Sequence, residues 1–227
     1  MEYGKRIVIY FIYIFILISF VACGQNKVNP AYKTTTEVNV INNNVADTLF
    51  KINGGKLADS NTFFNIERNL NIAINMDKNY KLSYLNLIKC IEISNTPPYP
   101  QQAEYLKKLI AICNTWLISH PDDKDMIVKR GIYYEKDKNT SMADKDYAAI
   151  ISYLNGIKFK LFLDIKPKVI EDYVSYAFLF VVAKRPAKGI KLIDNLYELF
   201  PDNPKVAIGH KILHTSSREE IVYQFKN

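Results

Sequence analysis

The sequence KDMIVKRGIYYEKDKNTSMADKDYAAIISYL occupies residues 124–154 and has the pattern of two helices joined by a short polar turn. Apolar, aromatic or small residues recur every three or four positions, which places them on one face of each helix. They are Ile127, Gly131 and Tyr134 in the first half, and Ala143, Tyr147 and Ile150 in the second. The small side chains of Gly131 and Ala143 allow the helices to approach closely, so we predict a hairpin over residues 124–136 and 141–154.

Helical spacing continues on both sides of this hairpin. It predicts a helical pattern from about residue 57 onward and helices over 103–117, 169–183, 187–200 and 204–213, with a short one after Ser217. Two further sets of residues each share one predicted face, namely Phe64, Leu70, Ala73 and Ile74, and Tyr84, Leu87, Ile88 and Ile91. Prolines 97, 98, 100, 121 and 204 mark breaks, because proline cannot continue a helix. With no convincing run of strands, the predicted fold class is all-α.

The helices form pairs that resemble one another. The first helices of three pairs align at Tyr84, Ile88 and Ile91, at Ile127, Gly131 and Tyr134, and at Tyr173, Ala177 and Phe180. The second helices of the last two pairs align at Ala143, Tyr147 and Ile150, and at Gly189, Ile193 and Tyr197, with Pro201 closing the last. This pattern resembles the tetratricopeptide repeat, which implies a right-handed solenoid of antiparallel helix pairs. The starts lie 43 and 46 residues apart, against a standard period of about 34. Another helical solenoid or a bundle is the alternative.

The resemblance also implies a binding surface, because the first helices of this family line a concave groove. Carried onto this chain, the groove positions of the best repeat are Asp125, Val128, Ile132, Glu135 and Lys136. Those of the preceding repeat are Leu82, Leu85, Lys89, Glu92 and Ile93. A mixed apolar and charged groove suits an extended peptide or the tail of another protein. The alternative is a partly buried scaffold surface without a partner.

The amino-terminal segment has the features of an export signal. Lys5 and Arg6 precede sixteen uncharged residues, 7–22, which end at Cys23. The run Phe20-Val21-Ala22-Cys23 resembles the lipobox of bacterial lipoproteins, although leucine is usual where Phe20 stands. The resemblance implies a signal peptide over residues 1–22 and a lipid on the thiol of Cys23. An uncleaved membrane anchor and an ordinary secreted protein are the alternatives.

We expect three regions along the chain: the signal peptide at 1–22, a polar tether at 23–46 that begins with the lipidated cysteine, and a helical-repeat domain at 47–227. The tether is rich in Asn and Thr and shows no helical period, although residues 35–41 alternate as in a short strand. Gly24, rather than aspartate, follows Cys23. This resembles lipoproteins on the periplasmic face of the outer membrane in some Gram-negative bacteria.

Charge and cysteine content restrict the class of partner. The net charge is +7 and the basic residues are dispersed, so we expect no nucleic-acid partner. The basic surface contacts anionic lipid headgroups or is simply solvated. Cys90 and Cys113 lie in apolar helical stretches, where they form a disulfide or remain buried thiols.

No group of residues predicts catalysis or metal binding. His210 and His214 stand four apart on one predicted helix face, but no Asp, Glu or Cys near them in the sequence completes a ligand set. His120 is expected to cap a helix end, and the acidic run around Asp123 a helix start. No phosphate-binding loop or hydrolase motif is present, so we expect no enzyme activity, no cofactor and no metal.

The sequence therefore predicts a lipid-anchored protein of the bacterial cell envelope that binds another protein through a helical-repeat groove. An immunity or inhibitor protein that neutralises an exported toxin is the alternative function. An envelope enzyme is a third class, for which no residue can be named.

Overall fold

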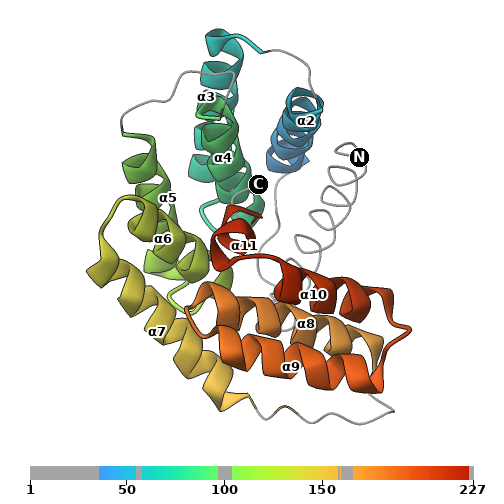
Figure 1. Cartoon of the computed structure of the whole chain (residues 1–227). Helices are drawn as coiled ribbons and strands as arrows, with labels where there is room; N and C mark the ends of the chain where they lie inside the picture. Colours follow the sequence, from blue (N-terminus) through green and yellow to red (C-terminus); the bar gives the residue numbers. More distant parts are fainter. Residues whose placement is uncertain (1–35, 55–57, 97–103, 158, 160–165, 225–227) are drawn as a thin grey trace. The chain divides into compact units, whose positions relative to one another are not determined.

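A computed structural model describes residues 36–224 of the chain, except 55–57, 97–103, 158 and 160–165 (Figure 1). The described residues form ten α-helices and no strand, which confirms the all-α fold class. The helices are α2 (Thr36–Asn53), α3 (Ser60–Met76), α4 (Lys81–Ser94), α5 (Tyr105–Ser119), α6 (Lys124–Lys136), α7 (Thr140–Gly156), α8 (Pro167–Val182), α9 (Pro186–Leu199), α10 (Pro204–Thr215) and α11 (Arg218–Gln224). Within these residues, no helix is both long enough and apolar enough to cross a bilayer.

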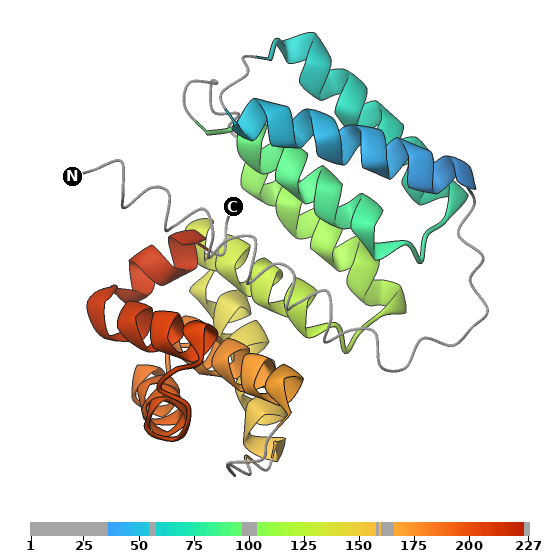
Figure 2. The ribbon, with the colours of Figure 1, turned by 90° about the vertical axis from the view of Figure 1, so that its right-hand side faces the viewer.

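The described helices divide between two compact units. The first unit, Asn29–Ala143, contains α2 to α6 and the start of α7, and the second unit contains the rest of the chain from Asp144 onward. In the first unit α2 packs against α3 and α4, α3 against α4, and α5 against α4 and α6 (Figure 2). In the second unit α8, α9 and α10 pack against one another, and α11 packs against α8. Within each unit, most helices thus contact the next one, and α2 and α8 also contact the next but one.

Helix α2 corrects the sequence prediction at the start of the domain. Residues 36–46, predicted as part of a polar tether with a short strand, lie in an 18-residue helix. Its buried positions are Val38, Asn42, Val45, Leu49 and Ile52, a spacing of four, three, four and three that fits one helix face. The period escaped detection because Asn42, a polar residue, occupies one of these positions. The remainder of the predicted tether, residues 23–35, lies outside the described residues.

The other helix boundaries agree closely with the predicted breaks, because capping residues and prolines set them. The carboxylates of Asp59 and Asp123 accept hydrogen bonds from the first turns of α3 and α6, and the amide oxygen of Asn203 does so for α10. Proline occupies the first turn of α8, α9 and α10, where its missing N–H costs nothing. One predicted face is partly wrong: α3 buries Leu70 and Ala73 as predicted, but it buries Phe63, whereas Phe64 is exposed.

The aligned repeat positions mostly lie in the cores of the two units. Tyr84, Ile88, Ile91, Ile127, Gly131, Tyr173, Ala177 and Phe180 are buried on the first helices, and Ala143, Tyr147, Ile150, Gly189 and Ile193 on the second. A Cβ on Gly189 would stand 2.4 Å from the carbonyl oxygen of Ala177. Helices α8 and α9 therefore cross where both carry a small residue. Tyr134 and Tyr197 are the exceptions, since both are partly exposed.

The two hairpin turns after α6 and α8 have the same backbone conformation. Lys138 and Lys184 both adopt φ of 61°, a left-handed conformation that ends many helices. The N–H of the next residue then bonds back five residues, from Asn139 to the oxygen of Tyr134 (2.8 Å) and from Arg185 to that of Phe180 (2.7 Å). The two turns stand 46 residues apart, the same offset as Ile127 and Tyr173 in the sequence alignment.

Cys90 and Cys113 are both buried thiols, and no disulfide joins them. Burial raises the pKa of the Cys90 thiol to about 12. At neutral pH this sulfur is a neutral thiol that packs as a small apolar group and has little nucleophilic character.

Candidate functional site

Side-chain contacts join α2, α4 and α6 in the first unit. The hydroxyl of Tyr80 donates to Asn39, and the amide of Asn42 donates to the hydroxyl of Ser83 (2.8 Å). Between α4 and α6, Lys81 bonds to Asp125, and the hydroxyl of Tyr133 donates to Glu92 (2.9 Å). The partners in these four pairs are separated by 41 to 44 residues. Residues that lie 41 to 44 positions apart in the sequence therefore face one another across neighbouring helices.

Lys81 lies at the centre of the α4–α6 contact. Its ammonium is 2.7 Å from Oδ2 of Asp125 and 2.9 Å from Oδ1 of Asp123. The other oxygen of Asp123 accepts a hydrogen bond from the indole of Trp116 (2.7 Å), and Oδ1 also accepts from the N–H of Met126. Desolvation lowers the pKa of Lys81, but Asp125 and Asp123 together raise it above its ordinary value. The structure confirms the prediction that Asp123 caps the start of a helix, here α6. Its contact with Lys81 was not predicted from the sequence.

The second contact between these helices is fully buried. Glu92 is 4% exposed, and its carboxylate accepts the hydrogen bond of Tyr133, which is 2% exposed. Burial, followed by the charge of Glu92, raises the pKa of Tyr133 well above its ordinary value. The hydroxyl therefore stays a donor at all physiological pH values.

These contacts correct part of the predicted groove. Val128 and Ile132 are 3% and 1% exposed; they lie in the core with Glu92, because α4 and α6 face each other over these positions. Asp125 forms an ion pair with Lys81, whereas Glu135 and Lys136 are partly exposed. On α4, the predicted positions Leu82, Leu85, Lys89 and Ile93 are exposed or half-buried and share one face.

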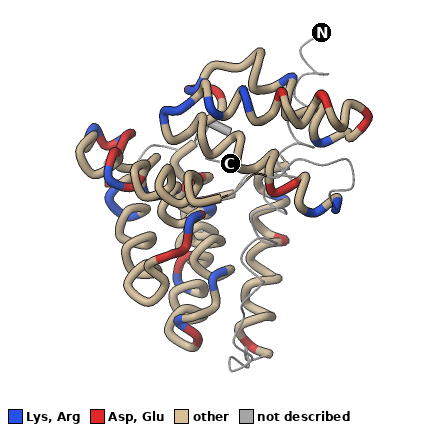
Figure 3. The backbone as a smooth tube through the Cα atoms, turned by 90° about the horizontal axis from the view of Figure 1, so that it is seen from below, with Lys and Arg blue, Asp and Glu red and all other residues tan. Residues whose placement is uncertain are grey.

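This surface of the first unit, the α4–α6 face, combines apolar side chains with two lysines. We define it by Leu82, Leu85, Lys89 and Ile93 on α4 and Lys129 on α6. Burial lowers the pKa of Lys89; the charge of Glu92 opposes this shift, and the charge of Lys129 adds to it. Elsewhere in the described residues, basic side chains are dispersed over the helices, as the sequence predicted (Figure 3).

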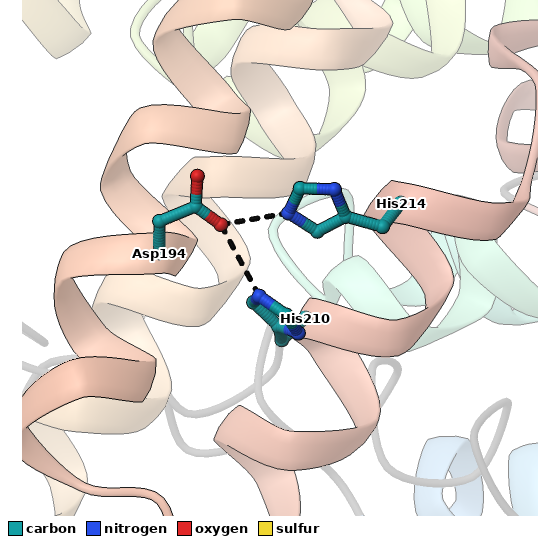
Figure 4. A group of neighbouring side chains, drawn as sticks. All are labelled: Asp194, His210 and His214. Atoms are coloured by element: carbon teal, nitrogen blue, oxygen red, sulfur yellow. Dashed lines mark hydrogen bonds and ion pairs between the residues drawn. The ribbon is translucent and has the colours of Figure 1, made fainter.

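A second cluster, the Asp–His cluster, lies in the second unit and consists of Asp194, His210 and His214 (Figure 4). Nε2 of His214 is 2.7 Å from Oδ1 of Asp194, and Nε2 of His210 is 3.3 Å from the same oxygen. The imidazole of His210 stacks on Tyr197, with ring centroids 4.2 Å apart and the planes inclined by 16°. The prediction that no acidic residue accompanies the histidines is therefore wrong.

The α9–α10 hairpin explains why Asp194 was missed. Asp194 precedes His210 by 16 residues, so it is distant in the sequence from both histidines. The turn centres near Asp202, however, and residues equally far from the centre of an antiparallel hairpin face each other. Asp194 and His210 each lie eight residues from it. The stop at Pro201 and the start at Pro204 were both recognised from sequence, and this symmetry is the signal that would have revealed the pair.

Two further predicted sites are the helix cap at His120 and the lipidation site at Cys23. His120 follows the last residue of α5, stacks on Trp116 and places Nδ1 3.3 Å from the oxygen of that residue, as expected for a helix end. Cys23, the predicted lipidation site, lies outside the described residues.

Compared with known proteins, the chain matches no family model, no curated protein and no solved structure at a significant level. Functional inference therefore depends on the contacts described above.

Proposed function

We propose that the protein is a lipid-anchored helical-repeat scaffold of the bacterial cell envelope that binds another protein on the α4–α6 face. The observation that carries this proposal is the constant separation of the residues that join α2, α4 and α6. Bonds that recur every 41 to 44 residues are expected of stacked repeats, and this spacing matches the 43 residues between Tyr84 and Ile127.

The second unit supports the same arrangement. Lys205 on α10 pairs with Glu171 on α8, 34 residues earlier, which is the standard tetratricopeptide period. Arg218 donates two hydrogen bonds to the carbonyl oxygen of Val182, 36 residues earlier. Together with the matching turns at Lys138 and Lys184, these contacts favour a solenoid of helix pairs over an irregular bundle.

The chemistry of the α4–α6 face favours an acidic partner segment. Burial lowers the pKa of Lys89 although the charge of Glu92 opposes the shift, so a further carboxylate from a partner would stabilise the charged ammonium. Leu82, Leu85 and Ile93 supply apolar surface along the same side of α4. Such a face suits an extended peptide with alternating acidic and apolar residues. The alternative role as an inhibitor of an exported toxin uses the same kind of surface.

Replacing Lys89 and Lys129 together by glutamine should weaken partner binding roughly tenfold, about 1.4 kcal/mol, and increase the dissociation rate. Cells carrying a photo-cross-linker at the exposed Leu82 would identify the partner, and its affinity would then be measured in solution at low and high salt. The matched control is Lys191→Gln with Lys211→Gln, which removes the same charge from exposed positions of α9 and α10.

Equal weakening in both double variants would mean that only net charge matters, and unchanged binding in both would place the binding surface elsewhere. An exported toxin as the partner would select the inhibitor role.

The anchoring part of the proposal predicts that Cys23→Ser abolishes lipid attachment, because the thiol of Cys23 is the acceptor. Cells would be labelled with a radioactive fatty acid, and the protein then isolated from wild-type and variant strains. Cys90→Ser is the control, since Cys90 is buried and its thiol is neutral. Equal label in wild type and Cys23→Ser would exclude the lipoprotein assignment.

A further inference from the structure

We propose that the Asp–His cluster is a binding site for a divalent transition-metal ion of the zinc type. Its three side chains offer two imidazole nitrogens and one carboxylate oxygen, all within 4.8 Å of one another. Two histidines and one carboxylate form a recurrent protein ligand set for Zn²⁺ and for Fe²⁺. Calcium and magnesium are poor candidates, because they prefer oxygen ligands alone.

The backbone under the cluster is held firmly. The side chain of Asn203 caps α10 by accepting hydrogen bonds from the N–H groups of Lys205 and Val206. A Cβ on Gly209 would meet Val174 at 3.0 Å and Ile193 at 3.3 Å, so α10 lies close to both α8 and α9 at this point. His210 follows Gly209 directly. The positions of the ligands therefore depend little on loop motion.

The side chains are already oriented toward a common point. His210 and His214 both direct Nε2 at Oδ1 of Asp194, and their ring centroids are 4.5 Å apart. Tyr197 covers one face of the His210 ring and restricts its rotation. In a tetrahedral zinc site with bonds near 2.1 Å, neighbouring ligand atoms lie about 3.4 Å apart. The 3.3 Å separation is close to this value, and the 2.7 Å separation is shorter than it, so His214 and Asp194 would move apart on binding the ion.

The site is also open to solvent. The side chains of His210, Asp194 and His214 are 30%, 39% and 41% exposed. An ion with three protein ligands would retain at least one position for water or for a group from another molecule, as in zinc sites that are not purely structural.

The test is a titration of the full-length protein in detergent with Zn²⁺ in competition with a chromophoric chelator. We expect one Zn²⁺ per chain, and at least a tenfold loss of affinity in His210→Ala, His214→Ala and Asp194→Asn. His120→Ala is the control, because it removes an imidazole far from the cluster in the sequence and in the other unit.

A thermal melt in the presence of chelator establishes that each variant is folded, and the more exposed His214 can be changed to glutamine if alanine is not tolerated. Failure of millimolar Zn²⁺ to bind would overturn the proposal, as would equal affinity in all variants. Titration with Co²⁺ adds an independent readout: a thiolate charge-transfer band would place the metal on a cysteine instead and would likewise overturn it.

Discussion

Gly189→Ala is expected to lower the free energy of unfolding by about 1–3 kcal/mol, as overpacking a tight contact typically does. The added methyl group would stand 2.4 Å from the carbonyl oxygen of Ala177 and 2.8 Å from Cγ2 of Val181. The first of these atoms belongs to the backbone of α8 and cannot rotate away, so the two helices must separate. This cost outweighs the gain of about 1 kcal/mol that alanine has over glycine in a helix.

Two other glycines in the second unit provide matched controls for this variant. No described residue lies within 4 Å of a Cβ on Gly156, so Gly156→Ala should be neutral or slightly stabilising. A Cβ on Gly209 meets side-chain atoms at 3.0 Å or more, so the cost of Gly209→Ala should be intermediate. Urea unfolding of the three variants measures the order of their free energies of unfolding. A Gly189→Ala protein as stable as wild type would mean that α8 and α9 do not cross at Ala177.

Lys81→Met is expected to lower the free energy of unfolding by about 2–3 kcal/mol. The substitution keeps the length of the side chain but leaves Asp123 and Asp125 without the ammonium that lies within 3 Å of both. Removing one partner of a buried ion pair costs about 3–5 kcal/mol, and the partial exposure of this cluster reduces the figure. The effect should be seen in the urea unfolding midpoint at neutral pH.

The control is Lys51→Met, because Lys51 forms a pair with Asp47 in which both side chains are more than half exposed. Such a pair contributes at most about 1 kcal/mol. The pKa of Lys81 is raised in the folded protein, so its stabilising contribution is complete below its unfolded pKa of about 10.4 and declines as the pH rises through the folded value. The difference between wild type and Lys81→Met should therefore shrink in strong alkali. Equal losses in Lys81→Met and Lys51→Met would show that the cluster is solvated.

The helices themselves were largely predictable from sequence, for identifiable reasons. Prolines and capping residues such as Asp123 and Asn203 act locally, so the breaks beside them could be located without a structure. The aligned small residues also indicated the close contact of Ala177 with Gly189. Helix α2 was missed because Asn42 occupies a core position. Its amide is satisfied there by Ser83 and its oxygen by Asn86, partners more than 40 residues away.

The candidate sites were less predictable, because they depend on which helices become neighbours. Ile132 was assigned to an open groove from its position in a repeat, yet its burial depends on where the partner helices lie. Lys81 had no role in the sequence prediction. It became central because α4 brings it to the start of α6, where Asp123 and Asp125 lie.

The sequence by itself determined where the helices other than α2 begin and end and which small residues let them cross, because periodicity, proline and capping act over a few residues. Only the tertiary structure decided which polar groups meet. Asp194 joins His210 and His214 because the short turn near Asp202 folds α10 back along α9. Lys81 meets its two carboxylates because α4 and α6 are neighbours. Such contacts depend on how helices cross and on their rotation about their own axes, which follow from the packing of whole faces.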